Sequence, residues 1–237
     1  PYGSGHINDT YCVVCEGEGG RPRRYILQRM NDGIFANIDQ LMENIVNVTS
    51  YLRRQILLRG GDPERETMNL LPTQKGKNYY TDSQGGYWRV YLFIEDAVCL
   101  DKVEKPEDFY ETAAAFGNFQ RLLAGFPADT LHETIPNFHN TISRFQDFER
   151  FVQADACGRA AGVQEEIRFA MARREEAGTL VRMQQAGRLP LRVTHNDTKL
   201  NNVMLDAKTG RGVCVIDLDT VMPGLALNDF GDSIRFG

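Results

Sequence analysis

The sequence predicts an α+β protein in which an antiparallel β-sheet with one main helix is followed by a mostly helical region. β-rich runs joined by turn residues fill most of the first 95 residues, and one stretch with helical spacing interrupts them. From about residue 96 the apolar residues recur with helical spacing, apart from a short β-hairpin expected within residues 193–224. With 237 residues, 42% of them hydrophobic, the chain has enough apolar material for one large or two small domains.

The N-terminal part is predicted to contain two strands, one helix and three further strands, in that order. Residues 10–15 (TYCVVC) and 24–30 (RYILQRM) are β-rich, and the glycines and proline of EGEGGRPR between them predict a hairpin. Apolar residues at helical spacing in FANIDQLMENIVNVTSYLRRQIL predict the helix, with Asn37 as its N-cap. Three further strands are expected in NLLPTQ, NYYTD and YWRVYLFI, with SQGG as the turn between the last two.

The C-terminal part is predicted to be helical. Three segments carry periodic apolar faces: PEDFYETAAAFGNFQRLLAGF, TISRFQDFERFVQ and the long AGVQEEIRFAMARREEAGTLVRMQQAG. The change of character falls at IEDA, residues 94–97, so we expect an N-terminal lobe of residues 1–95 and a C-terminal lobe of residues 96–237.

Charge and composition exclude several classes of partner. A net charge of −5 argues against binding to nucleic acid or to an anionic membrane, which needs clustered Lys and Arg. Because no apolar run approaches the roughly 20 residues of a membrane span, we expect a cytoplasmic protein. Its five scattered cysteines suit reduced thiols better than a disulfide framework.

One polar constellation carries chemistry. The stretch VTHNDTKLNNVMLDAKTGRGVCVIDLD contains His195-x-Asp197-x-x-x-x-Asn202, and Asp217 ends its last apolar run. Phosphoryl transfer from ATP needs a carboxylate to take the proton of the acceptor and oxygen ligands for magnesium. Asp197 fits the base, and Asn202 and Asp217 fit the ligands. A hairpin formed by NVML and VCVID would bring the two ligands together at one end.

Two other interpretations of these residues remain open. Each acid or amide alone could be a turn residue, although VCVID reads as a buried strand that ends in two acids, Asp217 and Asp219, on one side. Clustered aspartates also bind metal pairs in hydrolases that activate water. The rest of the chain, however, offers parts that suit phosphate binding.

The first of those parts is a glycine loop at the start of the chain. GSGHIN reads Gly3-x-Gly5-x-x-Asn8, with Ser4 between the glycines, and missing side chains let backbone amides approach phosphates. Asn8 replaces a third glycine and can still adopt positive φ. A simple hairpin turn is the alternative for this stretch alone.

A kinase-like site also needs a positively charged side chain that contacts the phosphates and is held in place by a carboxylate on the following helix. The strand YILQRM has no lysine, so we expect Arg29 to supply the charge and Glu43 to be its partner. Both could equally be exposed surface charges.

Taken together, HNDTKLNN, VIDLDTVMPG, GSGHINDTY and YILQR resemble the aminoglycoside phosphotransferase and choline kinase group of the protein-kinase-like fold. Most closely they resemble its N-acetylhexosamine 1-kinase branch. The resemblance spans nearly the whole chain in order; the two C-terminal motifs are specific, and the other two are supportive.

The resemblance implies a two-lobed protein-kinase-like fold: a nucleotide-binding sheet lobe, and a catalytic and acceptor-binding helical lobe with the β-hairpin. It implies ATP and Mg²⁺ as cofactors, and an amino sugar phosphorylated on its anomeric hydroxyl. Asp197 carries over as base, and Asn202 and Asp217 as magnesium ligands. Asp219 is implied as a further contact to metal or sugar, and His139, in IPNFHNT, as a sugar contact or else a loop or cap residue.

Several points stay open in the resemblance. Without a lysine on YILQRM, either Gln28 or Arg29 could contact the phosphates. Family members continue beyond DSIRFG, so we expect a fragment trimmed at both ends, with an incomplete acceptor pocket. An aminoglycoside, choline or a related small alcohol is the alternative acceptor, and a nucleotide-binding module without turnover is the alternative function. The sequence leaves the oligomeric state open.

Overall fold

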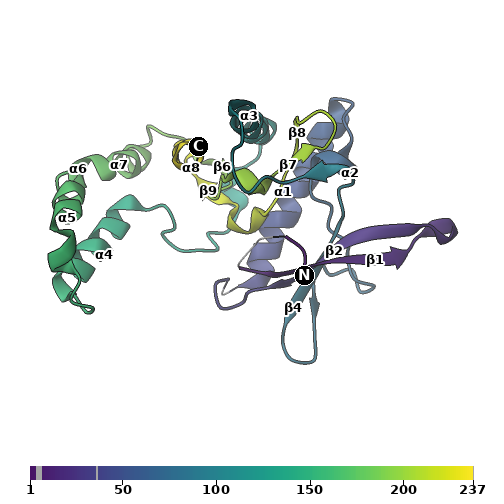
Figure 1. Cartoon of the computed structure of the whole chain (residues 1–237), viewed down its shortest axis with the longest axis horizontal. Helices are drawn as coiled ribbons and strands as arrows, with labels where there is room; N and C mark the ends of the chain where they lie inside the picture. Colours follow the sequence, from purple (N-terminus) through teal and green to yellow (C-terminus); the bar gives the residue numbers. More distant parts are fainter. Residues whose placement is uncertain (4–6, 36, 237) are drawn as a thin grey trace. The chain divides into compact units, whose positions relative to one another are not determined.

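The computed structural model describes residues 1–3, 7–35 and 37–236 (Figure 1). The chain divides into two compact units, the first formed by residues 1–134 and 192–237 and the second by residues 135–191. Each unit is considered by itself below. The predicted lobe boundary at residue 95 lies inside the first unit and stays a prediction.

A four-stranded antiparallel sheet opens the first unit, in the order β1-β2-β4-β3. The predicted hairpin is confirmed, because β1 (Asp9–Glu16) pairs with β2 (Pro22–Met30) along its whole length. In turn β2 pairs with β4 (Tyr87–Leu92), and the short β3 (Tyr80–Thr81) forms the far edge. The expected strand in NLLPTQ is reduced to a single bridge between Leu70 and Tyr91.

Helix α1 (Ile38–Leu58) supplies much of the core of this unit. Its predicted N-cap is confirmed, because the Asn37 side chain accepts a hydrogen bond from the backbone N–H of Gln40 at 3.1 Å. Its apolar side chains recur every three or four residues and are buried, namely Ile38, Leu41, Met42, Ile45, Val48, Leu52 and Ile56. A one-turn helix, α2 (Pro63–Glu66), follows.

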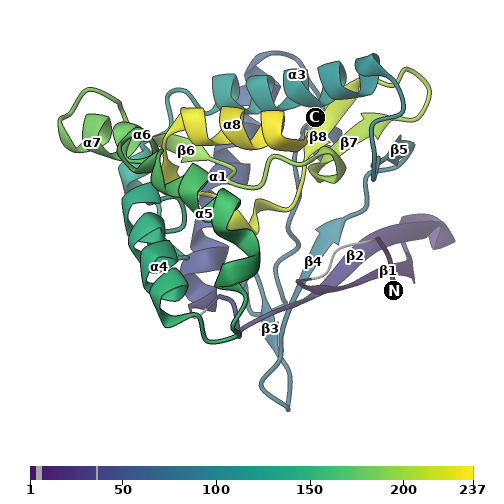
Figure 2. The ribbon, with the colours of Figure 1, turned by 60° about the vertical axis from the view of Figure 1, so that its left-hand side comes forward.

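Two small antiparallel sheets and two helices complete the first unit. The strand orders are β5-β7-β8 and β6-β9. Helix α3 packs on β7 and β8, α8 packs on β6, and the two helices lie side by side in Figure 2. The bounds are β5 (Ala97–Val98), α3 (Pro106–Leu122), β6 (Arg192–Thr194), β7 (Val203–Asp206), β8 (Gly212–Val215), β9 (Met222–Gly224) and α8 (Ala226–Phe236).

A glycine permits the close approach of α3 to β8. A Cβ atom at Gly212 would lie 2.8 Å from the Cβ of Ala115 and 3.0 Å from the carbonyl oxygen of Glu111. Any larger residue would therefore push the helix away from the hairpin that β8 forms with β7.

The second unit contains α4 (Thr141–Ala154), α5 (Gln164–Met171), α6 (Arg174–Ala177) and α7 (Thr179–Gln185). The predicted helix in TISRFQDFERFVQ is confirmed as α4. The predicted long helix that follows is wrong, because the chain breaks it into three short pieces. Arg173 leaves helical geometry at φ −105° and ψ 11°, and Gly178 separates the last two pieces.

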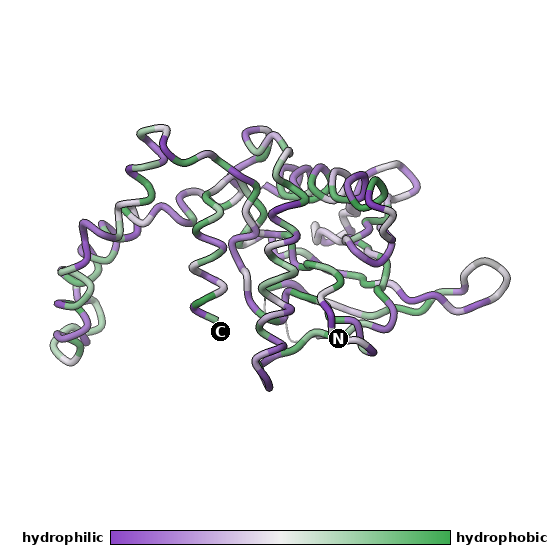
Figure 3. The backbone as a smooth tube through the Cα atoms, turned by 90° about the horizontal axis from the view of Figure 1, so that it is seen from above, coloured by the Kyte–Doolittle hydropathy of each residue, from purple (hydrophilic) through white to green (hydrophobic). Residues whose placement is uncertain are grey.

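Burial gives the physical reason for that break. In α5, α6 and α7 only Val181 is buried, so no continuous apolar face holds one long helix straight. Figure 3 shows hydrophobic and hydrophilic residues alternating along the helices. No helix in the described part of the chain is both long and apolar enough to serve as a membrane span.

Candidate active site

The loop after β6 carries the predicted base and begins with a buried histidine. His195 is fully buried, its Nε2 lies 2.9 Å from the carbonyl oxygen of Ile216, and its ring packs edge-on against Phe116 at 5.2 Å. This histidine therefore anchors the loop to the end of β8 and to α3.

Asp197 sits two residues further on, with its side chain 26% exposed. Its Oδ2 lies 2.8 Å from Nζ of Lys199 and accepts a hydrogen bond from Nδ2 of Asn202 at 3.0 Å. The carboxylate is thus held by an amide and a cation, yet it remains accessible. A positioned and accessible carboxylate is what a general base requires.

The predicted hairpin is confirmed and brings the two expected magnesium ligands to one end of it. Val203 of β7 pairs with Val215 of β8, and the N–H of Ile216 donates to the carbonyl oxygen of Asn202 at 2.9 Å. Asn202 therefore lies opposite the residue that precedes Asp217. The Asn202 amide nitrogen donates twice to Asp197, so its Oδ1 is the atom left to coordinate a cation.

Asp217 occupies a special place in the backbone. It adopts the left-handed conformation, φ 60° and ψ 59°, and its side chain is partly buried. Burial, followed by repulsion from Asp219, raises its pKa to about 6. The prediction that the two acids end a strand on one side is wrong, because a 3-10 turn at Leu218–Thr220 follows Asp217 directly.

An acid that no sequence motif singled out holds the loop in place. Asp229 of α8 accepts the backbone N–H of His195 at 2.9 Å, the N–H of Asn196 at 2.8 Å and the side-chain amide of Gln120 at 2.6 Å. One turn further on, Asp232 accepts the N–H of Thr198 at 2.7 Å. Two acids on one face of α8 thus position the segment that carries Asp197.

Arg29 of β2, the expected phosphate-contacting cation, is not paired with Glu43. Arg29 is half-exposed and lies 3.8 Å from Asp9, and the Glu43 carboxylate lies 2.8 Å from Nε2 of His132. The expected Arg29–Glu43 pair is therefore not formed. Successive residues on a strand face opposite sides, and the face of β2 that packs toward α1 carries Gln28.

A buried arginine occupies that inner face instead. Arg89 of β4 pairs with Gln28 in the sheet register and is 2% exposed. Its Nη2 lies 2.6 Å from Oδ1 of Asp219 and 2.6 Å from Oε1 of Gln28. The inner face therefore does carry a cation next to the acids, but it comes from the neighbouring strand.

The glycine loop reaches the same acids. Gly3 has φ 82°, a conformation that favours glycine, whereas Ser4 and Gly5 lie outside the described residues. At the other end of the loop, Nδ2 of Asn8 donates to Oδ2 of Asp219 at 2.6 Å, and Oδ1 of Asn8 accepts from the N–H of Asn31 at 2.9 Å. The phosphate-binding role predicted for this loop stays a prediction.

His139 belongs to the second unit, in the segment that precedes α4. Its ring lies 4.7 Å from that of Phe138. Its predicted contact with a sugar stays a prediction.

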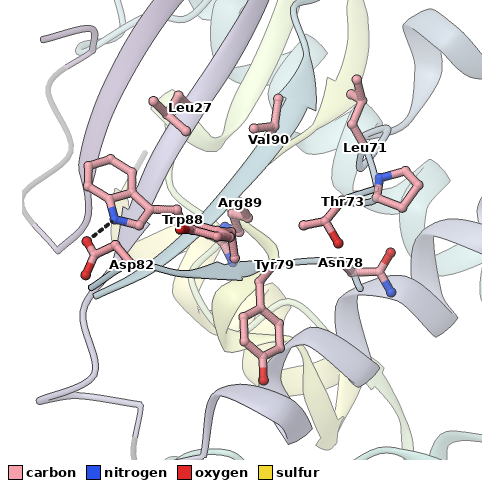
Figure 4. A pocket seen from close by; sticks show the side chains of 11 residues that line it. Leu27, Leu71, Thr73, Asn78, Tyr79, Asp82, Trp88, Arg89 and Val90 are labelled. Carbon is pink, nitrogen blue, oxygen red and sulfur yellow. Dashed lines mark hydrogen bonds between the residues drawn. The ribbon is translucent and has the colours of Figure 1, made fainter. Parts of the chain in front are cut away.

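A cavity of about 510 Å³ lies against the N-terminal sheet (Figure 4). Leu27, Trp88 and Val90 line it together with Arg89, which lies between Trp88 and Val90 on β4. The Trp88 indole donates to Asp82 at 2.7 Å at its rim. The cavity thus contains none of the predicted catalytic or metal-binding residues.

Among the described residues, His, Cys, Asp and Glu side chains form no group of three or more that could hold a metal ion. A magnesium ion on a nucleotide needs fewer protein ligands, because phosphate oxygens and water complete its octahedron. One amide oxygen and one carboxylate, as at Asn202 and Asp217, suit that donor set.

Comparison with known proteins agrees with this geometry. The model of the phosphotransferase enzyme family matches residues 1–237, the whole chain. The chain belongs to this family. Membership places the Asp197, Asn202 and Asp217 constellation within a phosphotransferase fold.

Solved structures support the same fold. An aminoglycoside phosphotransferase from Alicyclobacillus acidocaldarius is 15% identical, with a TM-score of 0.57 over 97% of this chain and 67% of its own. Aminoglycoside 2'-phosphotransferase-IIIa in its GDP complex is 12% identical, with a TM-score of 0.56 over 99% of this chain and 71% of its own.

Spectinomycin phosphotransferase, in complex with ADP and spectinomycin, is 14% identical, with a TM-score of 0.52 over 97% of this chain and 65% of its own. These likenesses confirm the predicted protein-kinase-like α+β fold. This chain spans about two thirds of the length of each solved structure.

Sequence reasoning missed Lys199, Arg89 and the two acids of α8. Lys199 follows Asp197 by two residues, and that spacing was a usable signal. Asp229 and Asp232 recur one helical turn apart in a short amphipathic segment, which marks a polar face but not its partner. Arg89 lies in a run that reads only as a strand, so nothing local pointed to it.

Proposed function

We propose that the protein is an ATP- and Mg²⁺-dependent small-molecule kinase that phosphorylates a hydroxyl group. The observation that carries the proposal is the convergence of Asp197, Asn202 and the end of β8 through direct hydrogen bonds. Family membership supports the reaction class, and structures of family-like folds with bound ADP or GDP support a nucleotide donor.

In this mechanism Asp197 receives the proton of the acceptor hydroxyl as that oxygen attacks the γ-phosphorus. Lys199 and Asn202, both on Oδ2 of Asp197, hold the carboxylate in one orientation. Because phosphoryl transfer depends mainly on alignment and charge stabilisation, fixing the base contributes directly to the rate.

Asn202 and Asp217 would hold magnesium, which neutralises charge on the phosphates when bound. The partly buried Asp217 carboxylate fits this role, because its surroundings raise its pKa and a cation would favour its ionised form. The glycine loop, Gly3–Asn8, and the inner face of the sheet are the proposed nucleotide-binding surfaces.

The preferred acceptor is an N-acetylhexosamine such as N-acetylglucosamine or N-acetylgalactosamine, phosphorylated on its anomeric hydroxyl. Support comes from the residue resemblance in HNDTKLNN, VIDLDTVMPG and IPNFHNT. Asp219 and His139 were the sugar contacts expected from that resemblance. An aminoglycoside is the second candidate, favoured by two solved structures with that substrate in their names.

The test is phosphate transfer from labelled ATP, with magnesium, to a panel of N-acetylhexosamines, aminoglycosides and amino alcohols. We expect an N-acetylhexosamine to be labelled at its anomeric oxygen. An aminoglycoside as the best acceptor would overturn the sugar assignment, and nucleotide binding without any transfer would favour a module without turnover.

The first testable variant is Asp197→Asn. It should lower kcat by about 10² to 10⁴-fold, the usual contribution of a general base, while nucleotide binding persists. Asp32→Asn, which changes an exposed acid in a loop, is the control and should keep full activity. Undiminished turnover by Asp197→Asn would remove Asp197 from the role of base.

A further inference from the structure

A buried ion pair joins the N-terminal sheet to the turn after Asp217. Nη2 of Arg89 lies 2.6 Å from Oδ1 of Asp219, and the two side chains are 1% and 4% exposed. A guanidinium is always charged, so burying it requires a compensating anion nearby. Asp219 is that anion.

Each oxygen of Asp219 lies beside a polar side chain of the protein, although Oδ1 accepts no hydrogen bond. Oδ1 faces Arg89, and Oδ2 accepts the side-chain amide of Asn8 at 2.6 Å. A metal cation that approached Oδ1 would be repelled by the charge of Arg89, which lies 2.6 Å from that oxygen, and a ligand on Oδ2 would compete with Asn8. Displacing Arg89 would leave a buried cation unpaired.

Arg89 is itself fixed on its other sides. Its Nε and Nη2 donate to Oε1 of Gln28 at 2.9 and 2.6 Å, and its guanidinium lies 5.2 Å from the centre of the Tyr91 ring. Gln28 in turn donates to the hydroxyl of Thr10 on β1 at 3.0 Å. These hydrogen bonds connect the Arg89–Asp219 pair to three strands of the sheet, β1, β2 and β4.

The opposite end of the network holds Ile7 and Asn8, which follow the glycines. Asn8 bridges Asp219 to the backbone N–H of Asn31, and Asn31 donates from its side chain to the carbonyl oxygen of Ile7 at 3.2 Å. The second acid of IDLD therefore contacts the sheet through one oxygen and the end of the loop through the other.

We propose that Arg89 and Asp219 act together as positioning residues that keep Asp219 away from metal and acceptor and fix Asn8, the last residue of the glycine loop, relative to Asp217. The proposal rests on the proposed kinase function and refines the division of labour between the two acids. Asp217 presents the negative charge to the metal, and Asp219, neutralised by Arg89, sets the position of Asn8.

The alternative role for Asp219, a direct ligand of metal or sugar, makes the opposite prediction for a double substitution. If Asp219 acts through Arg89, the double variant leaves neither residue of the pair as an unpaired buried charge. The amide oxygen introduced at position 219 can still accept the hydrogen bond from Asn8. If Asp219 is a ligand, removing Arg89 as well cannot replace the lost oxygen. Suppression of one variant by the other therefore separates the two roles.

The experiment compares Arg89→Met, Asp219→Asn and the double variant with the wild type and with Arg23→Met, an exposed arginine on β2. For each, kcat, KM for ATP and the magnesium concentration giving half-maximal rate are measured. The single variants should lose about 10²-fold in kcat/KM through misplacement, with the double variant recovering to within about tenfold of the wild type. The control should match the wild type.

Three results would overturn the proposal. A double variant as inactive as Asp219→Asn would assign Asp219 as a ligand, as would a raised magnesium requirement in every variant that lacks it. Single variants that shift only the thermal midpoint, with kcat and KM unchanged, would reduce the pair to a structural role. The double variant buries no unpaired charge, so it keeps the test available if a single variant does not fold.

Magnesium-dependent binding of a fluorescent ATP analogue separates this proposal from the proposed function. If the wild type binds the analogue but transfers phosphate to no acceptor, the kinase function fails. The pair is then judged by whether the double variant recovers the binding that the single variants lose. If the wild type binds no analogue, both proposals fall.

Discussion

The segment that carries the predicted base, residues 193–224, and the N-terminal sheet build their parts of the candidate site over very different distances along the chain. Asn202 bonds Asp197 from five residues away, and the hairpin that places Asp217 is closed by neighbouring strands. In the sheet, Arg89 reaches Gln28 across 61 positions, and Asn8 reaches Asp219 across 211. A local motif fixes the first region, whereas strand register and long-range packing fix the second.

The support of the catalytic loop by α8 gives the largest expected effect. Asp229→Ala leaves three donors without their acceptor, namely the N–H groups of His195 and Asn196 and the amide of Gln120. Unsatisfied buried donors cost about 1–3 kcal/mol each, so the loss of an acceptor for three of them should lower the free energy of unfolding by about 3–9 kcal/mol. Chemical denaturation measures this loss, and kcat should fall with it because the loop carries Asp197.

Asp232→Ala is expected to have a smaller effect than Asp229→Ala. Asp232 lies one turn further along α8 and bonds Thr198 of the same loop, so its loss should affect kcat more than stability. Asp32→Ala, at an exposed position, should change neither. If Asp229→Ala is as stable as the wild type, the loop is held by its own motif and the contribution of α8 is small.

Asp217 should show a conflict between stability and activity. Burial and the neighbouring Asp219 raise its pKa to about 6 from an ordinary value of 3.8, so the folded state binds this proton more tightly than the unfolded state. Asp217→Asn removes the partly buried charge and should stabilise the metal-free protein by at most about 3 kcal/mol. Phosphate transfer should be abolished, because the amide no longer supplies an anionic ligand.

The pH dependence of the stability gained by Asp217→Asn follows from the raised pKa of Asp217. Below about pH 4 the carboxyl is protonated in both states of the wild type, and the two proteins should be equally stable. As the pH rises from about 4 to about 6 the wild type loses stability relative to Asp217→Asn, and the advantage of the variant is at its full value above about pH 6. Thermal melts with a chelator between pH 4 and 8 measure it; an advantage that is constant with pH would exclude ionisation of Asp217 as the cause.

The same contrast explains what the sequence could predict. HNDTKLNN and VIDLD identify Asp197, Asn202 and Asp217 because base, ligands and hairpin lie within one stretch of about twenty residues, and local pairing brings them together. The glycines and prolines likewise marked the β1–β2 turn, and Asn37 marked the start of α1. The roles predicted for these site residues stay predictions until activity is measured.

The buried Arg89 could not be identified from a short sequence motif. YILQR offers Arg29 as the only cation near the expected position, but a strand turns successive side chains to opposite faces, so Gln28 rather than Arg29 packs inward. The register of β2 against β4 then decides that Arg89 lies beside Gln28. That register depends on the whole sheet, and no short motif encodes it.

The smallest expected effects come from a pair of variants that tests this face assignment directly. Gln28→Ala removes the acceptor of two Arg89 hydrogen bonds in a buried setting and should lower the free energy of unfolding by about 1–2 kcal/mol. Arg29→Ala removes a half-exposed side chain whose ion pair with Asp9 spans 3.8 Å, and it should change stability by less than about 0.5 kcal/mol. Urea denaturation of both variants at the same ionic strength gives the comparison. Equal or reversed effects would mean that β2 presents its other face to the site, and the cation first expected at Arg29 would regain its place beside the phosphates.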